Sequence, residues 1–397
     1  MQRTMRPRAH IAMVGMPMVS HILPSLEIIR ELVARGHRVT YAADPAVADL
    51  IAPTGAELVP VPSTLPFADN VWPEDGVAAM RLFVADAAQA LPRLAAFYDA
   101  DPADLYLYDI GGYAARALAE SQARPHVQLS PTYVAWQGYE ETVGAAVRAL
   151  PGYEVYAREG DAWLATTGAT TRDFEQFAGL PARAVATIPR AMQPFADQVD
   201  PAVVSFVGPC FGDRSGQGAW QRPAGAEKVV LVSLGSSYTQ QPDFYRACVA
   251  AFGGDVLPGW HTVLQIGKHT DPAVLGPLPD DVEVHPWVPQ LSVLSQADAF
   301  VTHAGMGGSS EGLYFGLPMI AVPQAAEQFA NADQLAALGV ARRIDTADAT
   351  AEALRSALTD LTGDPRVTAR SAELRAELLA EGGTARAADL LEAELPG

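Results

Sequence analysis

Short apolar runs alternate with amphipathic segments along the first 130 residues of the chain. Residues 10–15 (HIAMVG) predict a buried strand, and residues 37–43 (HRVTYAA) predict a second one. Between them, residues 24–36 carry apolar side chains at helical spacing, and Gly36 provides a stop for that helix. A strand, a helix and a strand this close together form a βαβ unit, so the pattern predicts a parallel sheet.

The alternation continues to residue 130 and then loosens. Further helices are expected at 47–55, 77–98 and 113–123, and further strands at 56–62, 104–109 and 126–130. From 131 to 199 aromatic residues are frequent, without a clear period. Two interpretations are compatible with this stretch, and both can hold. It can be an inserted group of helices with its own apolar packing, or the wall of a pocket for a bulky and partly apolar molecule.

A stretch rich in glycine, proline and polar residues, 212–228, separates two halves of similar pattern and reads as a linker. Strands are expected again from Val229 and at 261–267, 282–285, 299–303 and 319–323, with amphipathic helices from Ala351 onwards. At 397 residues the chain is too long for one ordinary domain. We therefore expect domains at 1–211 and 229–380 and a C-terminal helix at 381–397. Two doubly wound domains offer ligands the carboxyl ends of both sheets.

The composition narrows the classes of partner. A net charge of −19 argues against nucleic acid and anionic membranes, so a phosphate ligand would have to be held locally by backbone N–H groups. Only Cys210 and Cys248 occur, which gives no disulfide framework and favours a reduced, cytoplasmic setting. The uncharged run at 11–26 lacks a cleavage site, and no segment is clean and long enough to span a bilayer.

His21 and Asp109 are candidates for proton transfer. His21 is expected in the loop after the first strand, and Asp109 ends the strand at 104–109. A histidine with an ordinary pKa near ~6.5 suits a general base, and the carboxylate could fix its tautomer and stabilise the imidazolium. The alternatives are a solvated loop histidine and an aspartate that caps a turn.

Most of the candidate ligand-binding residues lie near the end of the chain. Trp287 opens a proline-containing turn, His303 ends a strand, and a glycine-rich turn leads into a helix expected to begin near Gly308. Free N–H groups at such a helix start, with its partial positive charge, suit an anion. The alternatives are a glycine turn that only permits tight packing and a tryptophan that belongs to the core.

Carboxylates and an amide complete this segment. Glu311 is expected in the first turn of the same helix, and Glu327–Gln328 follow the next strand. A flat ring suits a base, a carboxylate suits ribose hydroxyls, and a carboxylate–amide pair suits sugar hydroxyls. Ser310 stands where the last glycine or alanine of a dinucleotide fingerprint belongs, so the run does not match that motif.

Taken as a whole, the run from Trp287 to Gln328 resembles the donor-binding signature of family 1 UDP-glycosyltransferases in its bacterial form. The resemblance extends over nearly the whole chain and is greatest to the actinobacterial macrolide glycosyltransferases. It implies an α/β fold of the GT-B architecture, two facing Rossmann-like domains with a C-terminal helix crossing back to the N-terminal domain. It also implies inverting, metal-independent transfer of a sugar, glucose foremost, from a UDP-sugar to a hydroxyl of a macrolide or similar natural product. In antibiotic producers such transfer often inactivates the antibiotic.

The resemblance assigns roles to individual residues. His21 would be the base and Asp109 its partner, Trp287 and Gln290 would hold the nucleobase, and Glu311 the ribose. Glu327 and Gln328 would hold the sugar hydroxyls. The remaining donor-binding residues surround the diphosphate or line the same segment: Ser236, Val288, His303, Gly305, Gly307, Gly308 and Ser309.

Two positions depart from the family's pattern. Ser20 stands where a glycine usually precedes the histidine, which bears on the conformation of that segment. Glu327 stands where aspartate is usual, so its carboxylate lies one methylene further from the backbone. This difference can change which sugar the site binds.

Acceptor contacts are expected from the N-terminal half, at Phe67, Ile110, Thr132 and Trp136 by position. The sequence Asp99–Ala100–Asp101 matches an Asp-x-Asp metal-binding motif, but it follows a predicted helix and precedes Pro102, so we interpret it as a turn. Neither a metal ion nor another cofactor is expected. The partners are then a UDP-sugar and a hydroxylated natural product, and a homodimer is left open. A non-catalytic auxiliary partner of another glycosyltransferase and a dinucleotide-dependent oxidoreductase are the rival hypotheses.

Overall fold

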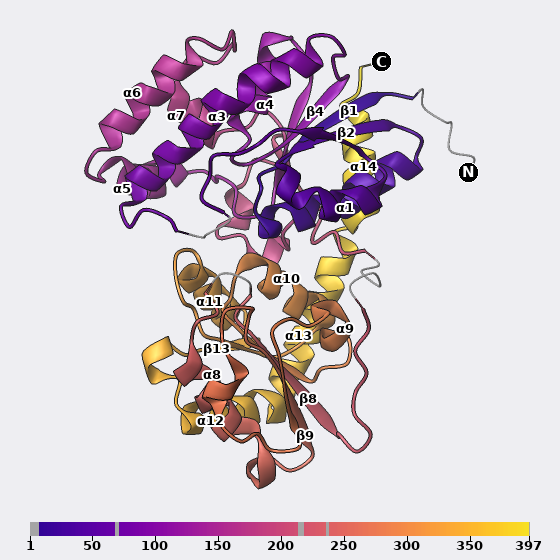
Figure 1. The fold of residues 1–397 in the computed structure, drawn as a ribbon, viewed down its shortest axis with the longest axis vertical. Coiled ribbons are helices and arrows are strands. Elements are labelled where there is room, and N and C mark those ends of the chain that lie inside the picture. Colours follow the sequence, from indigo (N-terminus) through magenta and orange to yellow (C-terminus); the bar gives the residue numbers. More distant parts are fainter. Residues whose placement is uncertain (1–7, 68–70, 213–217, 236–237, 397) are drawn as a thin grey trace. The chain divides into compact units, whose positions relative to one another are not determined.

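The computed structural model describes residues 8–67, 71–212, 218–235 and 238–396. The chain forms two compact units, one of residues 1–211 with 381–397 and one of residues 212–380. Both consist of a parallel sheet covered by helices (Figure 1). This confirms the α/β fold with two Rossmann-like domains.

The described part of the first unit contains a seven-stranded parallel sheet in the order β3-β2-β1-β4-β5-β6-β7. Its central strands are buried along their whole length, as expected of a parallel sheet with helices on both faces. The strands are β1 (His10–Val14), β2 (Arg38–Ala43), β3 (Glu57–Pro60), β4 (Leu105–Asp109), β5 (His126–Ser130), β6 (Ala184–Ala186) and β7 (Val204–Phe206).

Amphipathic helices cover this sheet, and local capping sets some of their starts. The longest begins after Asp75, whose side chain accepts a hydrogen bond from the Ala78 N–H at 2.7 Å. The helices are α1 (Val19–Ala34), α2 (Ala48–Ile51), α3 (Gly76–Tyr98), α4 (Tyr113–Ser121), α5 (Ala145–Arg148), α6 (Tyr153–Leu164), α7 (Phe174–Gly179) and α14 (Gly383–Ala393). Short 3-10 turns at 45–47, 52–54, 190–192 and 196–198 and a π turn at 140–144 join them.

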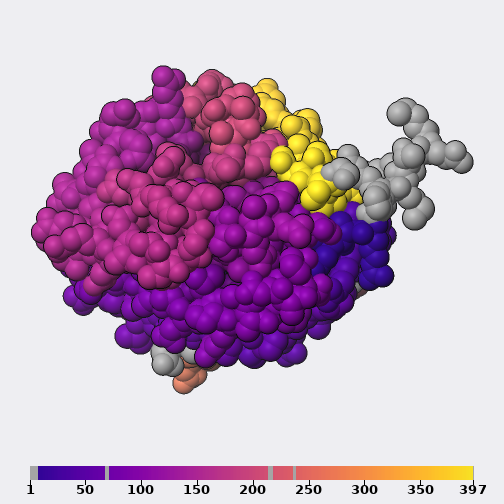
Figure 2. Space-filling model, turned by 90° about the horizontal axis from the view of Figure 1, so that it is seen from above, coloured from indigo at the N-terminus to yellow at the C-terminus, as the bar shows by residue number. Residues whose placement is uncertain are grey.

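The C-terminal helix α14 belongs to the first unit. Ala387, Ala388 and Leu391 are buried in the core that α1, β1 and β2 also form. Glu392 accepts from Arg35 at 2.8 Å and from His37 at 3.1 Å. Figure 2 shows the C-terminal segment, in yellow, against the indigo N-terminal segment. Segments more than 350 positions apart in the sequence therefore share one core.

The described part of the second unit contains a six-stranded parallel sheet in the order β10-β9-β8-β11-β12-β13. The strands are β8 (Lys228–Ser233), β9 (Trp260–Gln265), β10 (Val282–His285), β11 (Ala299–Thr302), β12 (Met319–Ala321) and β13 (Ala341–Arg343). The helices are α8 (Pro242–Phe252), α9 (Gln290–Leu294), α10 (Met306–Phe315), α11 (Gln328–Ala337), α12 (Ala351–Gly363) and α13 (Pro365–Ala380), with 3-10 turns at 254–256, 272–275 and 346–348.

Three short strands have no counterpart in the sequence prediction. β6, β7 and β13 have three residues each, so they are too short to show a period, and only their pairing in the sheet defines them. The part of the expected linker around Trp220 packs against the second unit, because its backbone is hydrogen-bonded to the side chains of Ser292 and Gln296. Within the described residues, every helix is too short or too polar to cross a membrane.

The packing of α14 makes a testable prediction. Leu391 is fully buried in the core of the first unit, so Leu391→Ala should lower that unit's free energy of unfolding by about 2–5 kcal/mol. Leu379→Ala is the matched control, since Leu379 is 45% exposed and its truncation should cost about 0.5 kcal/mol or less. Hydrogen exchange of the β1 amides measures the effect, and equal protection in both variants would contradict this packing.

Candidate functional site

Each sheet reverses its strand order at one point, and His21, Asp109 and His303 lie at or just after the ends of the strands that flank these points. In the first unit the reversal lies between β1 and β4, which pair in parallel. In the second it lies between β8 and β11. Open parallel sheets bind ligands outside the carboxyl ends of their strands at such points.

The structure brings His21 and Asp109 together. Nδ1 of His21 lies 3.0 Å from both carboxylate oxygens of Asp109. Asp109, at the end of β4, is 2% exposed and also accepts from the Gly111 N–H at 3.2 Å, whereas the His21 side chain is 20% exposed. A carboxylate on Nδ1 fixes the tautomer that carries its proton there, so Nε2 is the atom that can take a proton.

The local structure around His21 differs from the prediction. His21 lies in the first turn of α1, which begins at Val19, and not in a loop before a helix that begins at Pro24. Pro24 lies in the second turn, where its missing N–H leaves the carbonyl of Ser20 without an intrahelical partner. Because Ser20 is exposed, water can bind that carbonyl.

The glycine-rich turn after β11 is shaped around His303. A Cβ on Gly235, which follows β8, would lie 2.7 Å from the imidazole, and a Cβ on Gly305 would also overlap it. The ring is therefore packed between two backbones that only glycine permits. Gly305 is the N-cap of α10, which begins at Met306. The N–H groups in the first turn of this helix, including those of Gly307 and Gly308, have no intrahelical acceptor.

Ala304 and Ser309, on either side of the start of α10, are both buried and support this turn. Ala304 adopts the left-handed region with φ 59°, and its carbonyl accepts from the side-chain amide of Asn331 at 2.8 Å. Burial lowers the pKa of His303 to about 4, so the ring is neutral at pH 7 and acts as a hydrogen-bonding group, not as a cation. Ser309 is completely buried and its N–H is bonded to the Gly305 carbonyl, so it supports the turn from within.

The loop between β10 and α9 presents the proposed base-binding ring. Trp287 is 53% exposed, whereas the neighbouring Val288 is buried. Gln290, the first residue of α9, donates a hydrogen bond to the Glu311 carboxylate. Glu311 itself corrects the prediction: it lies in the second turn of α10, because that helix begins two residues earlier than expected. A contact with the half-buried amide of Gln290, and not the helix start, holds this carboxylate.

The two predicted sugar-binding residues after β12, Glu327 and Gln328, differ in their burial. Glu327 is exposed, and Gln328 is buried at the start of α11. The carbonyl oxygen of the Gln328 side chain accepts from the backbone N–H groups of Gln324 at 2.9 Å and Ala325 at 3.2 Å. This fixes the end of that loop. Ser236, also predicted here, lies outside the described residues.

The predicted acceptor residues all lie on segments that follow strands of the first unit, and all are half-buried. Phe67 lies beyond β3, Ile110 directly after Asp109, and Thr132 and Trp136 beyond β5. Trp136 packs edge-on against Tyr139, with ring centroids 4.9 Å apart.

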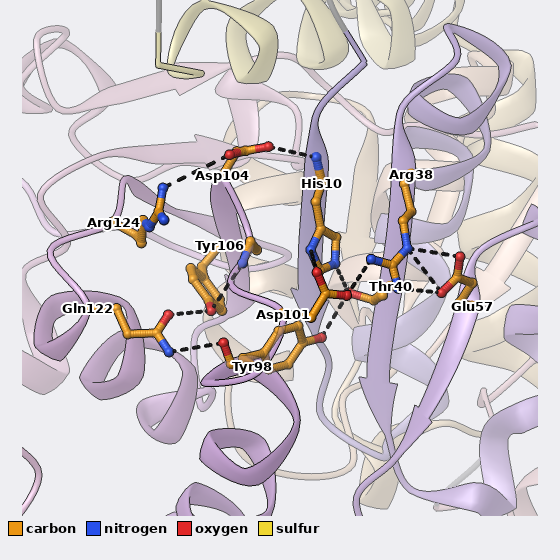
Figure 3. A network of polar contacts seen from close by, with 11 residues as sticks. His10, Arg38, Thr40, Glu57, Tyr98, Asp101, Asp104, Tyr106, Gln122 and Arg124 are labelled. Carbon is orange, nitrogen blue, oxygen red and sulfur yellow. Dashed lines mark hydrogen bonds and ion pairs between the residues drawn. The ribbon is translucent and has the colours of Figure 1, made fainter.

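Asp101 belongs to a structural network away from the candidate site (Figure 3), and Asp99 is bonded to Gln122, another member of that network. Asp101 pairs with Arg38, the first residue of β2, and Asp99 accepts from Gln122 at 2.9 Å. Arg38 begins its strand, so the network lies at the amino edge of the sheet. Within the described ranges no group of three or more His, Cys, Asp or Glu could hold a metal ion.

Two buried amides were missed by the sequence analysis, Gln265 and Asn331. Each bonds the backbone of a loop at the carboxyl edge of the second sheet. Gln265 ends a strand whose pattern was recognised, so a polar residue at a buried strand end was the available signal. Asn331 lies within α11, and nothing in its local pattern marks it.

Comparisons with known proteins give one consistent result. Residues 261–393 match the family described as "Erythromycin biosynthesis protein CIII-like, C-terminal domain". The oleandomycin glycosyltransferase of Streptomyces antibioticus is 56% identical over 98% of this chain and 91% of its own. The NDP-glycosyltransferase YjiC of Bacillus licheniformis is 32% identical over 97% and 98%. The solved structure of the glycotransferase of kitacinnamycin superposes with a TM-score of 0.92 at 51% identity, over 98% of this chain and 100% of that one.

The burial of His303 predicts its titration. We expect its ring to titrate near pH 4, below its ordinary value of 6.5, because burial disfavours the charged form. Between these values the unfolded chain holds the extra proton, so this residue lowers the free energy of unfolding as the pH falls from 6.5 to 4. Ring NMR signals, assigned with a His303→Gln variant, measure the titration, and a midpoint near 6.5 would contradict it.

Proposed function

Because the chain belongs to the family 1 macrolide glycosyltransferases, which transfer sugars to natural products, we propose that its donor is UDP-glucose and its acceptor a hydroxyl of a macrolide. The enzyme class rests on relatives that are named glycosyltransferases. The choice of a macrolide is supported by the relative at 56% identity, which is an oleandomycin glycosyltransferase. We further propose that glucosylation inactivates the antibiotic inside the producing cell.

The observation that carries the mechanism is the hydrogen bond between His21 and Asp109. Asp109 holds the proton on Nδ1, so Nε2 can accept the proton of the acceptor hydroxyl. As that proton leaves, the acceptor oxygen forms a bond to the anomeric carbon of the sugar. The bond from this carbon to the diphosphate breaks, and UDP departs with the electron pair. One displacement of this kind inverts the anomeric centre.

The second unit supplies the donor contacts in this proposal. Trp287 stacks on uracil, and Gln290 and Glu311 bind the base and ribose. The first turn of α10 donates hydrogen bonds to the diphosphate, whose charge the helix dipole stabilises, and His303 lies beside this turn. Glu327 and Gln328 bind the sugar hydroxyls.

We propose that the reaction needs no metal ion. The partial positive charge at the start of α10 and its first-turn N–H groups, which have no acceptor within the helix, can stabilise the leaving diphosphate as its negative charge develops. An auxiliary, non-catalytic protein would not need a base with an oriented tautomer, and the intact His21–Asp109 pair favours the catalytic proposal.

The proposed reaction can be tested directly. We expect the protein, UDP-glucose and oleandomycin to give a product heavier by one hexose, together with UDP, in the presence of EDTA. Mass spectrometry detects the product, and the coupling constant of its anomeric proton reports inversion. Parallel reactions with TDP-glucose and other UDP-sugars identify the donor. Loss of activity in EDTA would overturn the metal-free proposal, and reaction with TDP-sugars alone would overturn the choice of UDP.

Removal of the base should affect turnover and not donor binding. His21→Ala should lower kcat by about a hundredfold or more, the scale of a lost general base. Asp109→Asn should also lower kcat, because an amide cannot stabilise the imidazolium. UDP affinity, measured by calorimetry, should stay unchanged in both variants. His126→Ala is the control, since His126 begins β5 at the opposite edge of the sheet, and full activity in His21→Ala would exclude this mechanism.

A further inference from the structure

A single buried side chain lies between the two halves of the proposed donor site. Gln265 is the last residue of β9, where it pairs in register with Ser233 of β8 and His285 of β10. It is 6% exposed. The strands on either side of it lead into the turn that contacts His303 and the loop that carries Trp287.

All three hydrogen bonds of the Gln265 side chain go to these neighbours. Its Nε2 donates to the Ser233 hydroxyl at 3.1 Å and to the Gly235 carbonyl at 3.2 Å. Its Oε1 accepts from the Val288 N–H at 3.1 Å. One planar amide therefore joins the backbone after β8 to the backbone after β10.

On one side, this amide fixes the base-binding ring. Val288 is 2% exposed and its N–H is tied to Gln265, while Trp287 immediately before it is 53% exposed. The same loop is held at its end by the contact between Gln290 and Glu311. With Val288 anchored, the backbone that carries the indole has little freedom, which limits the positions that the ring can take before a base arrives.

On the other side, the amide fixes the turn at the diphosphate end. Gly235 has φ +75° and lies against the His303 imidazole, so its carbonyl cannot move far without disturbing that ring. Nε2 of Gln265 holds this carbonyl. A displacement of either segment would leave buried donors or acceptors without partners, which costs free energy.

We propose that Gln265 is a positioning residue that couples the base-binding loop to the diphosphate-binding turn, so that a nucleoside diphosphate is recognised as one unit. The inference rests on the proposed function, in which Trp287 contacts the base and the turn around His303 contacts the diphosphate. Gln265 touches no substrate. It acts on affinity for the donor and not on the proton transfer at His21.

The test uses Gln265→Met, which keeps the shape of the side chain and removes its hydrogen bonds. We expect the Kd for UDP to rise about 10- to 100-fold, the cost of one to two unsatisfied buried groups, with kcat at saturating donor changed less than about threefold. Gln265→Glu, which can accept from Val288 but cannot donate to Gly235, should also weaken UDP. Thr262→Val is the matched control, because Thr262 is fully buried on the same strand and its hydroxyl has no hydrogen-bond partner among the described residues.

Coupling through the loop is tested by combining variants. If Gln265 acts through the position of Trp287, Gln265→Met should weaken UDP much less in a Trp287→Ala background than in the wild type. Equal UDP affinity in wild type, Gln265→Met and Gln265→Glu would overturn the inference, as would independent effects of the two substitutions. Failure of both the wild type and Thr262→Val to bind UDP would instead overturn the proposed function.

Discussion

The parallel pairing of β1 with β4, and of β8 with β11, is the constraint on which the chemistry of this protein depends. Parallel strands end at a common edge, so residues far apart in sequence reach one place without a special loop. His21 and Asp109, 88 positions apart, meet in this way across the switch point of the first sheet. In the second sheet, the segments after β8, β10, β11 and β12 share the corresponding edge.

Within that frame, buried amides and glycines fix the loops. Gly235 and Gly305 allow the His303 ring to lie against backbone, Asn331 holds the strained Ala304, and Gln265 ties two loops together. In a chain with a net charge of −19, the proposed diphosphate site relies on N–H groups at a helix start and not on a basic patch. Rigid support for these groups is therefore part of the proposed binding site.

Much of the fold could be predicted because helices and parallel strands have distinct hydrophobic patterns. β5 and β10 have the bounds expected from their apolar runs, and α3 begins one residue early, after the Asp75 cap. The errors fall where the local signal is weak. Strands of three residues carry no period, and a proline inside α1 made that helix look shorter than it is.

The sequence by itself determined the type of fold, the resemblance to a glycosyltransferase family and the identity of the candidate residues, because these depend on residue type and spacing. The tertiary structure alone decided which of them meet. It placed the Asp109 carboxylate on Nδ1 of His21, buried Glu311 against Gln290, and separated Asp101 from the site by pairing it with Arg38. It also gave Gln265 hydrogen-bond partners on two loops that the sequence does not reveal, because hydrogen bonds between loops are set by the pairing of strands and not by neighbours in the chain.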